Sequence, residues 1–237
     1  MSDEGLQVGS FTSTSRLVMG TGGARDHVEL RQALVASGAT LATVALRRVS
    51  ADVNGSLYDL LSDLNFALLP NTAGCKTVNE ALTTAELARE AFATPRIKLE
   101  VIGDESTLLP DPLATVEAAA ALVDRGFEVW AYTNDDLTVA QRLEQVGCAA
   151  VMPLGSPIGS GLGVRNPHAI ALICDRLTVP VLLDAGIGTA SDATIAMELG
   201  CDAVLMNTAV AQAKNPVLMA QAMKKAVEAG QIGRAHV

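Results

Sequence analysis

Short apolar segments alternate with amphipathic segments of helical period from one end of this 237-residue chain to the other. The apolar segments are rich in Val, Leu, Ile and Ala, which is typical of parallel strands that are buried on both faces. We expect eight strands, at residues 16–20, 40–46, 66–70, 96–103, 128–133, 149–153, 179–184 and 203–207. Eight strand–helix units in this length favour an α/β fold of the (β/α)8 TIM-barrel type over an open doubly wound sheet.

Capping residues and glycines mark where the intervening helices begin and end. Three helix starts combine a capping side chain with a proline at the first helical position: Asp111-Pro112, Asn166-Pro167 and Asn215-Pro216. Thr77 and Glu80 have the spacing of a capping box. Glycines suited to a left-handed cap follow four helical segments: Gly38, Gly126, Gly147 and Gly200. Because no linker interrupts the pattern, residues 1–237 are expected to form one domain with a core of about residues 10–230.

The composition excludes several classes of protein. Hydrophobic residues make up 49% of the chain and charged residues 18%, which is far from the composition of disordered proteins. The net charge of −9 disfavours nucleic acids and acidic membranes as partners. Neither a signal peptide nor an apolar run long enough to span a bilayer is found, so we expect a soluble, cytoplasmic protein. The four cysteines lack zinc-site spacing, and neither a metal nor a disulfide is expected.

Lys98 is the only one of the five lysines that falls inside a predicted strand. Strand alternation places Lys98 and Glu100 on the face toward the barrel interior, and Ile97 and Leu99 on the face toward the helices. Burial favours the neutral amine, which can attack a carbonyl to form an imine, whereas a touching carboxylate favours the ammonium. The sequence leaves this balance open, and it also allows a purely structural ion pair. We interpret Lys98 as catalytic because desolvated charges concentrate at functional sites.

Further candidate residues follow the carboxyl ends of the predicted strands. Asp184 ends the seventh strand, and two carboxylates beside one lysine suit repeated proton transfer next to a ketone or an imine. Asn71 and Thr72 end the third strand and could hydrogen-bond a substrate. Trp130 and Tyr132 are expected to pack in the fifth strand, with Tyr132 nearer the mouth of the barrel.

Glycine-rich loops follow the later strands. Glycines recur after strand six, at 155, 159, 161 and 163, and after strand seven, at 186 and 188, while Asn207 and Thr208 follow strand eight. In TIM barrels the loops after strands seven and eight commonly bind phosphate, so the sequence predicts a phosphate site there, the alternative being that the glycines serve tight turns. The loop at 20–23 lacks the third glycine of the dinucleotide fingerprint, which disfavours a nicotinamide cofactor.

Four motifs in the same order are similar to those of the thiazole synthase family of thiamin biosynthesis. The motifs are LPNTAG at 69–74, IKLEVI at 97–102, MPLGSPIGSG at 152–161 and DAGIGTASDA at 184–193. The likeness extends over most of the chain, from about Leu17 to Ala229. The resemblance implies a barrel of the ribulose-phosphate-binding type, a homo-oligomer, and no metal or organic cofactor.

The resemblance also implies a reaction. In that family a barrel lysine forms an imine with the ketone of 1-deoxy-D-xylulose 5-phosphate. Sulfur arrives as a thiocarboxylate on a small ubiquitin-like carrier protein, and condensation with dehydroglycine closes the thiazole phosphate carboxylate. By motif match, Lys98 would form the imine, and Glu100 and Asp184 would be the acid–base pair. The sugar-phosphate contacts would be Gly159, Ala185, Gly186, Asn207 and Thr208.

Two segments depart from the family pattern. The family usually has a lysine and an aromatic residue in the loop after the first strand, whereas Gly22-Gly23-Ala24-Arg25 stands here. The chain ends in residues 232–237, IGRAHV, which match one reading frame of a common sequencing adapter. We hypothesise that these six residues replace a natural basic tail, in which case His236 has no functional meaning.

Two other functions fit the sequence. A Schiff-base aldolase of a phosphorylated sugar would share the lysine and the phosphate loops but would need no protein sulfur donor. A noncatalytic scaffold that only docks the carrier protein is the second, because the first loop and the tail are altered.

Overall fold

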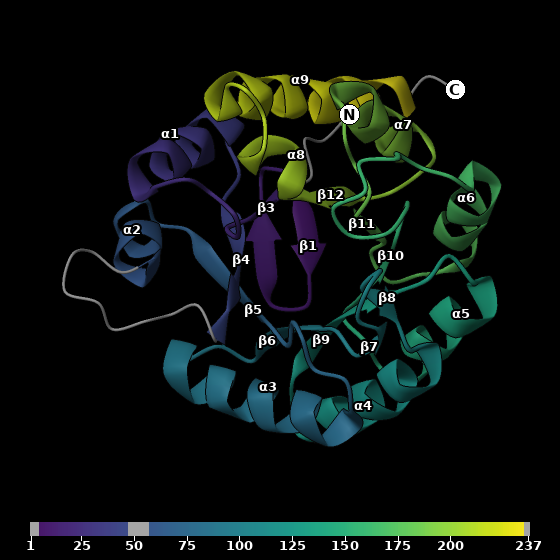
Figure 1. Cartoon of the computed structure of the whole chain (residues 1–237). Helices are drawn as coiled ribbons and strands as arrows, with labels where there is room; N and C mark the ends of the chain where they lie inside the picture. Colours follow the sequence, from purple (N-terminus) through teal and green to yellow (C-terminus); the bar gives the residue numbers. More distant parts are fainter. Residues whose placement is uncertain (1–4, 47–56, 235–237) are drawn as a thin grey trace.

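The computed structural model describes residues 5–46 and 57–234, which form a closed barrel of parallel strands surrounded by helices (Figure 1). Eight strands pair in the order β10-β9-β6-β5-β4-β3-β12-β11, and every pairing between them is parallel. Two bridges, Val151 with Val181 and Leu154 with Asp184, join the two ends of this order and close the ring. The expected (β/α)8 barrel is therefore confirmed.

The barrel strands lie close to their predicted positions. They are β3 (Leu17–Gly20), β4 (Leu41–Ala45), β5 (Ala67–Asn71), β6 (Arg96–Leu99), β9 (Glu128–Thr133), β10 (Ala150–Pro153), β11 (Leu182–Asp184) and β12 (Ala203–Met206). The outer helices are α1 (His27–Ser37), α2 (Leu57–Asp63), α3 (Val78–Phe92), α4 (Pro112–Asp124), α5 (Leu137–Gln145), α6 (Pro167–Arg176), α7 (Ala190–Glu198), α8 (Thr208–Ala211) and α9 (Pro216–Arg234).

Two predicted strands are too long: the one at 179–184 begins only at Leu182, and the one at 96–103 ends early. β6 ends at Leu99, and Ile102 instead begins β7 (Ile102–Asp104), which pairs antiparallel with β8 (Leu109–Pro110). The reason is local hydrogen bonding, because the backbone after Leu99 finds partners outside the barrel ladder. The Ile102 N–H donates to the Cys75 carbonyl at 2.8 Å, and the Asp111 N–H donates to the Val101 carbonyl at 2.8 Å.

Most of the predicted helix signals are confirmed. Asp111 and Asn166 cap α4 and α6 through their side chains. Asn215 accepts the Leu218 N–H at 3.0 Å in the first turn of α9. The capping box at Thr77 is only half formed, because Thr77 accepts the Glu80 N–H but the Glu80 carboxylate accepts from the backbone of Lys76. The four predicted cap glycines, Gly38, Gly126, Gly147 and Gly200, all have positive φ angles.

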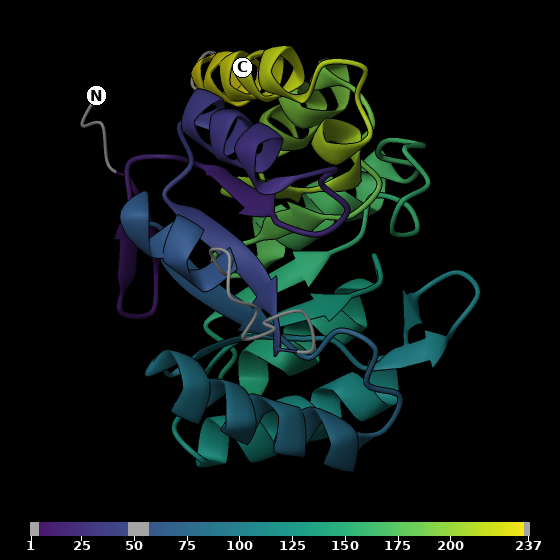
Figure 2. The same ribbon diagram turned by 60° about the vertical axis from the view of Figure 1, so that its left-hand side comes forward.

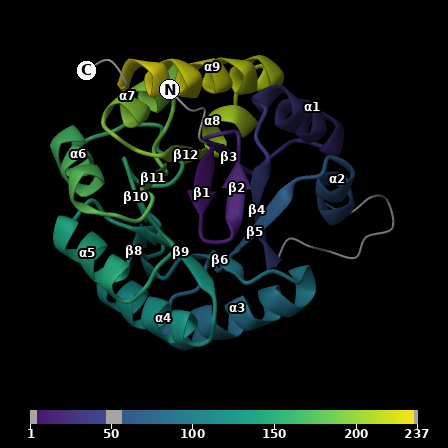
Figure 3. The ribbon, with the colours of Figure 1, turned by 180° about the vertical axis from the view of Figure 1, so that it is seen from behind.

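An amino-terminal hairpin that the sequence pattern does not predict closes one end of the barrel. Its strands β1 (Leu6–Val8) and β2 (Phe11–Ser13) lie across the centre of the ring when the molecule is seen from behind (Figure 3). The hairpin buries Leu6, Val8 and Phe11 against side chains of the barrel interior such as Trp130. Figure 2 shows this hairpin at one end of the barrel and β7–β8 protruding at the other. The opposite, carboxyl end of the barrel stays open for a site.

Phe11 anchors the hairpin to the barrel floor. Its ring lies 6.2 Å from that of Trp130, and the Arg96 guanidinium lies 5.3 Å from the Phe11 centroid. We expect Phe11→Ala to lower the free energy of unfolding in urea by about 3 kcal/mol, because a buried aromatic side chain is lost. Leu113→Ala, at a residue that is 72% exposed, is the control and should change it by no more than about 0.5 kcal/mol. Equal effects of the two substitutions would show that the hairpin does not stabilise the floor.

Candidate active site

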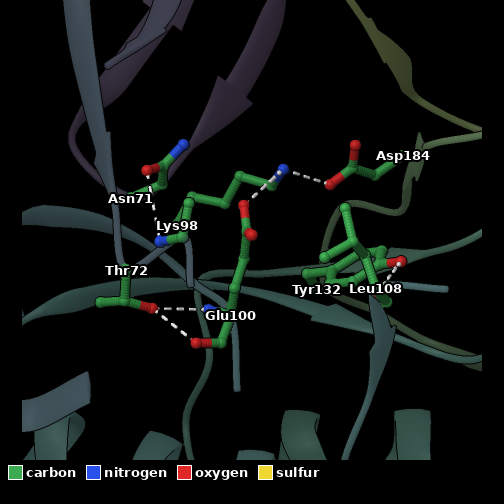
Figure 4. A network of polar contacts seen from close by, with 8 residues as sticks. Asn71, Thr72, Lys98, Glu100, Leu108, Tyr132 and Asp184 are labelled. Atoms are coloured by element: carbon green, nitrogen blue, oxygen red, sulfur yellow. Dashed lines mark hydrogen bonds and ion pairs between the residues drawn. The ribbon is translucent and has the colours of Figure 1, made fainter. Parts of the chain in front are cut away.

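A lysine and two carboxylates meet inside the open end of the barrel (Figure 4). Lys98 extends from β6, Glu100 lies just beyond the end of that strand, and Asp184 ends β11. The Lys98 Nζ lies 3.1 Å from Glu100 Oε1 and 2.6 Å from Asp184 Oδ2. All three residues are at most 5% exposed, while Ile97 and Leu99 pack in the layer toward the helices. The alternation therefore orients Lys98 and Glu100 as the sequence predicted.

The two carboxylates decide the protonation state of the lysine. Burial by itself lowers the pKa of Lys98, but the ion pairs with Asp184 and then with Glu100 outweigh it, and the net pKa is raised. Burial raises the pKa of Asp184, the charge of Lys98 opposes this, and the charge of Glu100 adds to it. The sequence left open whether these groups touch. Because they do, Lys98 is an ammonium in the free protein, and Asp184 is the nearest group that can accept its proton.

Two aromatic residues pack beneath and beside this cluster. The Lys98 Nζ lies 5.5 Å from the centroid of the Tyr132 ring, and the Tyr132 hydroxyl donates to the Leu108 carbonyl at 3.3 Å. Burial, followed by the charges of Asp184 and Glu100, raises the pKa of Tyr132. Trp130 packs deeper, against Phe11. Both aromatic residues pack as expected, and Tyr132 is the one near the site.

A cavity of about 770 Å³ opens above the lysine, which is within the usual size range of small-molecule sites. All eight residues assigned from the motif match line this cavity: Lys98, Glu100, Asp184, Gly159, Ala185, Gly186, Asn207 and Thr208. Asn71 also lines it, as do Thr21 and Thr43, of which Thr43 was not singled out from the sequence. Lys98 is the only lysine or arginine among the described residues that line it. The structure thus brings the predicted residues together, and their roles stay predictions.

The glycine-rich loops after β10 and β11 pack directly on one another. A Cβ atom on Gly186 would lie 2.1 Å from Ser156 Oγ, and one on Gly188 would lie 2.4 Å from the Gly161 carbonyl oxygen. The Gly163 N–H also donates to the Gly186 carbonyl at 2.8 Å. At Gly186 and Gly188, glycine is therefore required for loop packing, whatever these loops bind.

Asp192 limits which amides of these loops are free for an anion. Its Oδ2 accepts the N–H groups of Gly188 at 3.0 Å and Thr189 at 2.8 Å, and a complete capping box forms at the start of α7. A substrate phosphate cannot use those two amides without displacing a carboxylate. Thr208 lies in the first turn of α8 and lines the cavity, and first-turn amides have no partner within their own helix. This makes the α8 side the better candidate for the phosphate site that the sequence predicts.

Two histidines and the arginine of the altered first loop lie away from the cavity. His27 and His168 lie in the first turns of α1 and α6, and neither lines it. Arg25, in the altered first loop, pairs with Glu29 at 3.6 Å and does not line it either. Residues 232–234 form the last turn of α9, whereas 235–237, including His236, lie outside the described residues.

Within residues 5–46 and 57–234, no three His, Cys, Asp or Glu side chains gather closely enough to hold a metal ion. Over the same residues, no helix combines the length and apolarity needed to cross a membrane. The four cysteines are free thiols. Burial raises the pKa of Cys148 to about 12, which keeps that thiol protonated at neutral pH.

Fold and site together define a TIM-barrel enzyme with a buried lysine between two carboxylates at the carboxyl ends of its strands. The family model of the thiazole biosynthesis protein ThiG matches residues 7–236, so the chain belongs to this family of thiazole synthases. The resemblance seen in the sequence is thereby confirmed.

One of the similar solved structures supports this assignment. The BexX/CysO complex of Amycolatopsis orientalis shows 34% identity and a TM-score of 0.87, over 97% of this chain and 95% of the other. Thiamine phosphate pyrophosphorylase of Pyrococcus furiosus shows 18% identity and a TM-score of 0.59, over 90% and 95% of the two chains. A native KDPGal structure shows 15% identity and a TM-score of 0.62, over 94% and 98%. The last two share the fold only.

Removal of the buried ammonium should make stability depend more strongly on pH. In Lys98→Met the two carboxylates lose their cation, and we expect unfolding in urea at pH 8 to become easier by about 3 kcal/mol. The loss in the free energy of unfolding, relative to the wild type, should be smaller at pH 5.5. A carboxyl group whose pKa is raised in the folded state binds more protons there than when unfolded, so the variant's stability falls as pH rises.

Lys76→Met is the matched control, because Lys76 is a surface lysine in a single exposed ion pair with Glu105. It should change stability by less than about 1 kcal/mol at both pH values. A loss for Lys98→Met that is equal at pH 5.5 and pH 8 would contradict the coupling between the lysine and the carboxylates.

Proposed function

We propose that this thiazole synthase forms an imine between Lys98 and the ketone of 1-deoxy-D-xylulose 5-phosphate. The observation that carries the proposal is the contact of one buried ammonium with two carboxylates at the base of a large cavity. A charged lysine in this position is costly as a stabilising device, because two carboxylates must also be desolvated. It is well suited to chemistry that moves protons on and off an amine.

The contacts suggest an order of steps. Asp184 takes a proton from the Lys98 ammonium, and the free amine adds to the substrate ketone. The resulting carbinolamine loses its hydroxyl as water, with a proton supplied by Asp184 or Glu100, and leaves the imine. Either carboxylate then removes a proton from the carbon next to the imine and returns one to the neighbouring position, which moves the carbonyl function along the sugar. Two bases on one amine allow both transfers without bulk water.

The sugar phosphate binds at the α8 side of the cavity, which we call its anion end. Asn207 and Thr208 would contact it from the start of α8, while Gly159, Ala185 and Gly186 would contact it from the two packed loops. The Asn207 side chain is free of a capping bond to its helix. Since the described residues that line the cavity offer no cation besides Lys98, we infer that backbone amides and hydroxyl and amide side chains hold the phosphate.

The sulfur donor is proposed from the family and from the solved relative. The Amycolatopsis orientalis relative is described in complex with a second protein, CysO. We infer that this chain likewise receives sulfur from a ubiquitin-like carrier protein that ends in a thiocarboxylate, and that dehydroglycine supplies the remaining ring atoms. We also expect the enzyme to self-associate.

Reductive trapping tests the imine. We expect incubation with 1-deoxy-D-xylulose 5-phosphate and borohydride to attach the sugar phosphate to the peptide that contains Lys98, because borohydride reduces an imine to a stable amine. Peptide mapping by mass spectrometry reads the result. Lys76→Met should trap like the wild type, whereas Lys98→Met should not trap. Labelling of another lysine, or none, would count against the proposal.

Dependence on the carrier separates this function from its alternatives. We expect thiazole phosphate carboxylate to form only when carrier thiocarboxylate and dehydroglycine are both added, as measured by chromatography of the product. Trapping at Lys98 with cleavage or condensation of the sugar in the absence of carrier would indicate a Schiff-base aldolase. Carrier binding without any trapping would indicate a docking scaffold.

A further inference from the structure

The Thr72 side chain binds the backbone of Glu100 from both sides. Its hydroxyl accepts the Glu100 N–H at 2.8 Å and donates to the Glu100 carbonyl at 2.8 Å (Figure 4). Thr72 is 0% exposed and does not line the cavity, although the sequence suggested it as a substrate contact. Its hydroxyl therefore binds the protein backbone and does not reach the cavity where a substrate would lie.

This contact replaces the barrel ladder where that ladder ends. β6 stops at Leu99, so the pairing of β6 with its neighbours does not extend to the Glu100 backbone. The backbone of Thr72 fixes the flanking residues: its N–H donates to the Lys98 carbonyl at 3.1 Å, and its carbonyl accepts the Cys75 N–H at 3.1 Å. Cys75 in turn accepts the Ile102 N–H. The segment 72–75 thus holds residues 98–102, with the Thr72 hydroxyl at the centre.

The position of the Glu100 carboxylate depends on this arrangement. A glutamate side chain rotates about several bonds, so a stable backbone is needed to keep Oε1 at 3.1 Å from the Lys98 Nζ. If the hydroxyl were removed, the buried N–H and carbonyl of Glu100 would lose these partners, and the local backbone would shift to regain hydrogen bonds.

We propose that Thr72 is a positioning residue of the thiazole synthase, whose hydroxyl fixes the Glu100 backbone and thereby holds the Glu100 carboxylate against Lys98. The inference rests on the proposed roles of Lys98 and Glu100. It adds a residue that contacts neither substrate nor lysine side chain and acts only through the backbone of its neighbour.

The test compares Thr72→Val, which has nearly the same shape without the hydroxyl, with Thr72→Ser, which retains it. We expect Thr72→Val to lower kcat for thiazole formation roughly 10- to 100-fold, because small displacements of catalytic groups cost about this much, with little change in KM. Thr72→Ser should recover most of the rate. Thr115→Val is the matched control, since Thr115 in α4 is equally buried and its hydroxyl donates at 2.7 Å to the carbonyl of Asp111, the N-cap residue of that helix.

The pH profile of borohydride trapping distinguishes positioning from mere stabilisation. A displaced Glu100 stabilises the Lys98 ammonium less, so the free amine is available at lower pH. The pH at which trapping is half-maximal should therefore be lower in Thr72→Val than in the wild type. Glu100→Gln should shift this midpoint in the same direction but by more. Adding Thr72→Val to Glu100→Gln should neither shift the trapping midpoint further nor lower kcat further, because the carboxylate that Thr72 positions is already gone.

The possible outcomes distinguish a failure of the positioning role of Thr72 from a failure of the proposed function. An unchanged midpoint in Thr72→Val, or a full additional loss in the double variant, would overturn the positioning role. Should Thr72→Val fail to fold, Thr72→Cys, with a weaker donor and acceptor of similar size, should show a smaller shift in the same direction, and no shift there would overturn the proposal too. Wild-type protein that does not trap at Lys98 would overturn the proposed function and the role of Thr72 with it.

Discussion

The ion cluster of Lys98, Glu100 and Asp184 is the interaction on which the site depends. Three charges are taken out of water at the centre of the barrel, and their mutual contacts of 3.1 and 2.6 Å offset much of the cost of desolvating them. The same contacts raise the pKa of Lys98 and favour its ammonium form. In the proposed mechanism, reactivity therefore comes from a proton transfer within the cluster and not from a permanently neutral lysine, which is the option that burial alone would have favoured.

The rest of the fold keeps this cluster in place and away from water on one side. The β1–β2 hairpin fills the amino end of the barrel with Phe11 against Trp130, and the Tyr132 ring packs beside the ammonium, with its centroid 5.5 Å from the Lys98 Nζ. Among the described residues, the cluster faces the cavity at the carboxyl end of the barrel, where the proposed substrate would enter. A closed floor and a single mouth suit an imine, because an imine is lost when excess water reaches it.

The sequence predicts the barrel well and the details of the site in part. Strand alternation is strong enough to place Lys98 and Glu100 inward, and proline and glycine signals mark most helix ends. The β1–β2 hairpin is not predicted, because its strands are only three residues long and carry no repeated pattern. The true end of β6, and with it the role of Thr72, depends on hydrogen bonds between residues 28 positions apart, which no local pattern encodes.

The proposed imine chemistry restricts where the substrate phosphate can bind. Among the described residues that line the cavity, one cation faces two carboxylates, and that cation must lose its charge to form an imine. A sugar phosphate held by the same lysine would oppose the reaction, because an anion beside the amine favours the ammonium. In the proposed mechanism, a phosphate bound by neutral amides and hydroxyls at the α8 side of the cavity avoids this conflict. Close packing of Gly186 on Ser156 and of Gly188 on Gly161 brings the backbone of the glycine-rich loops to the cavity wall. The lysine would then remain free for the ketone.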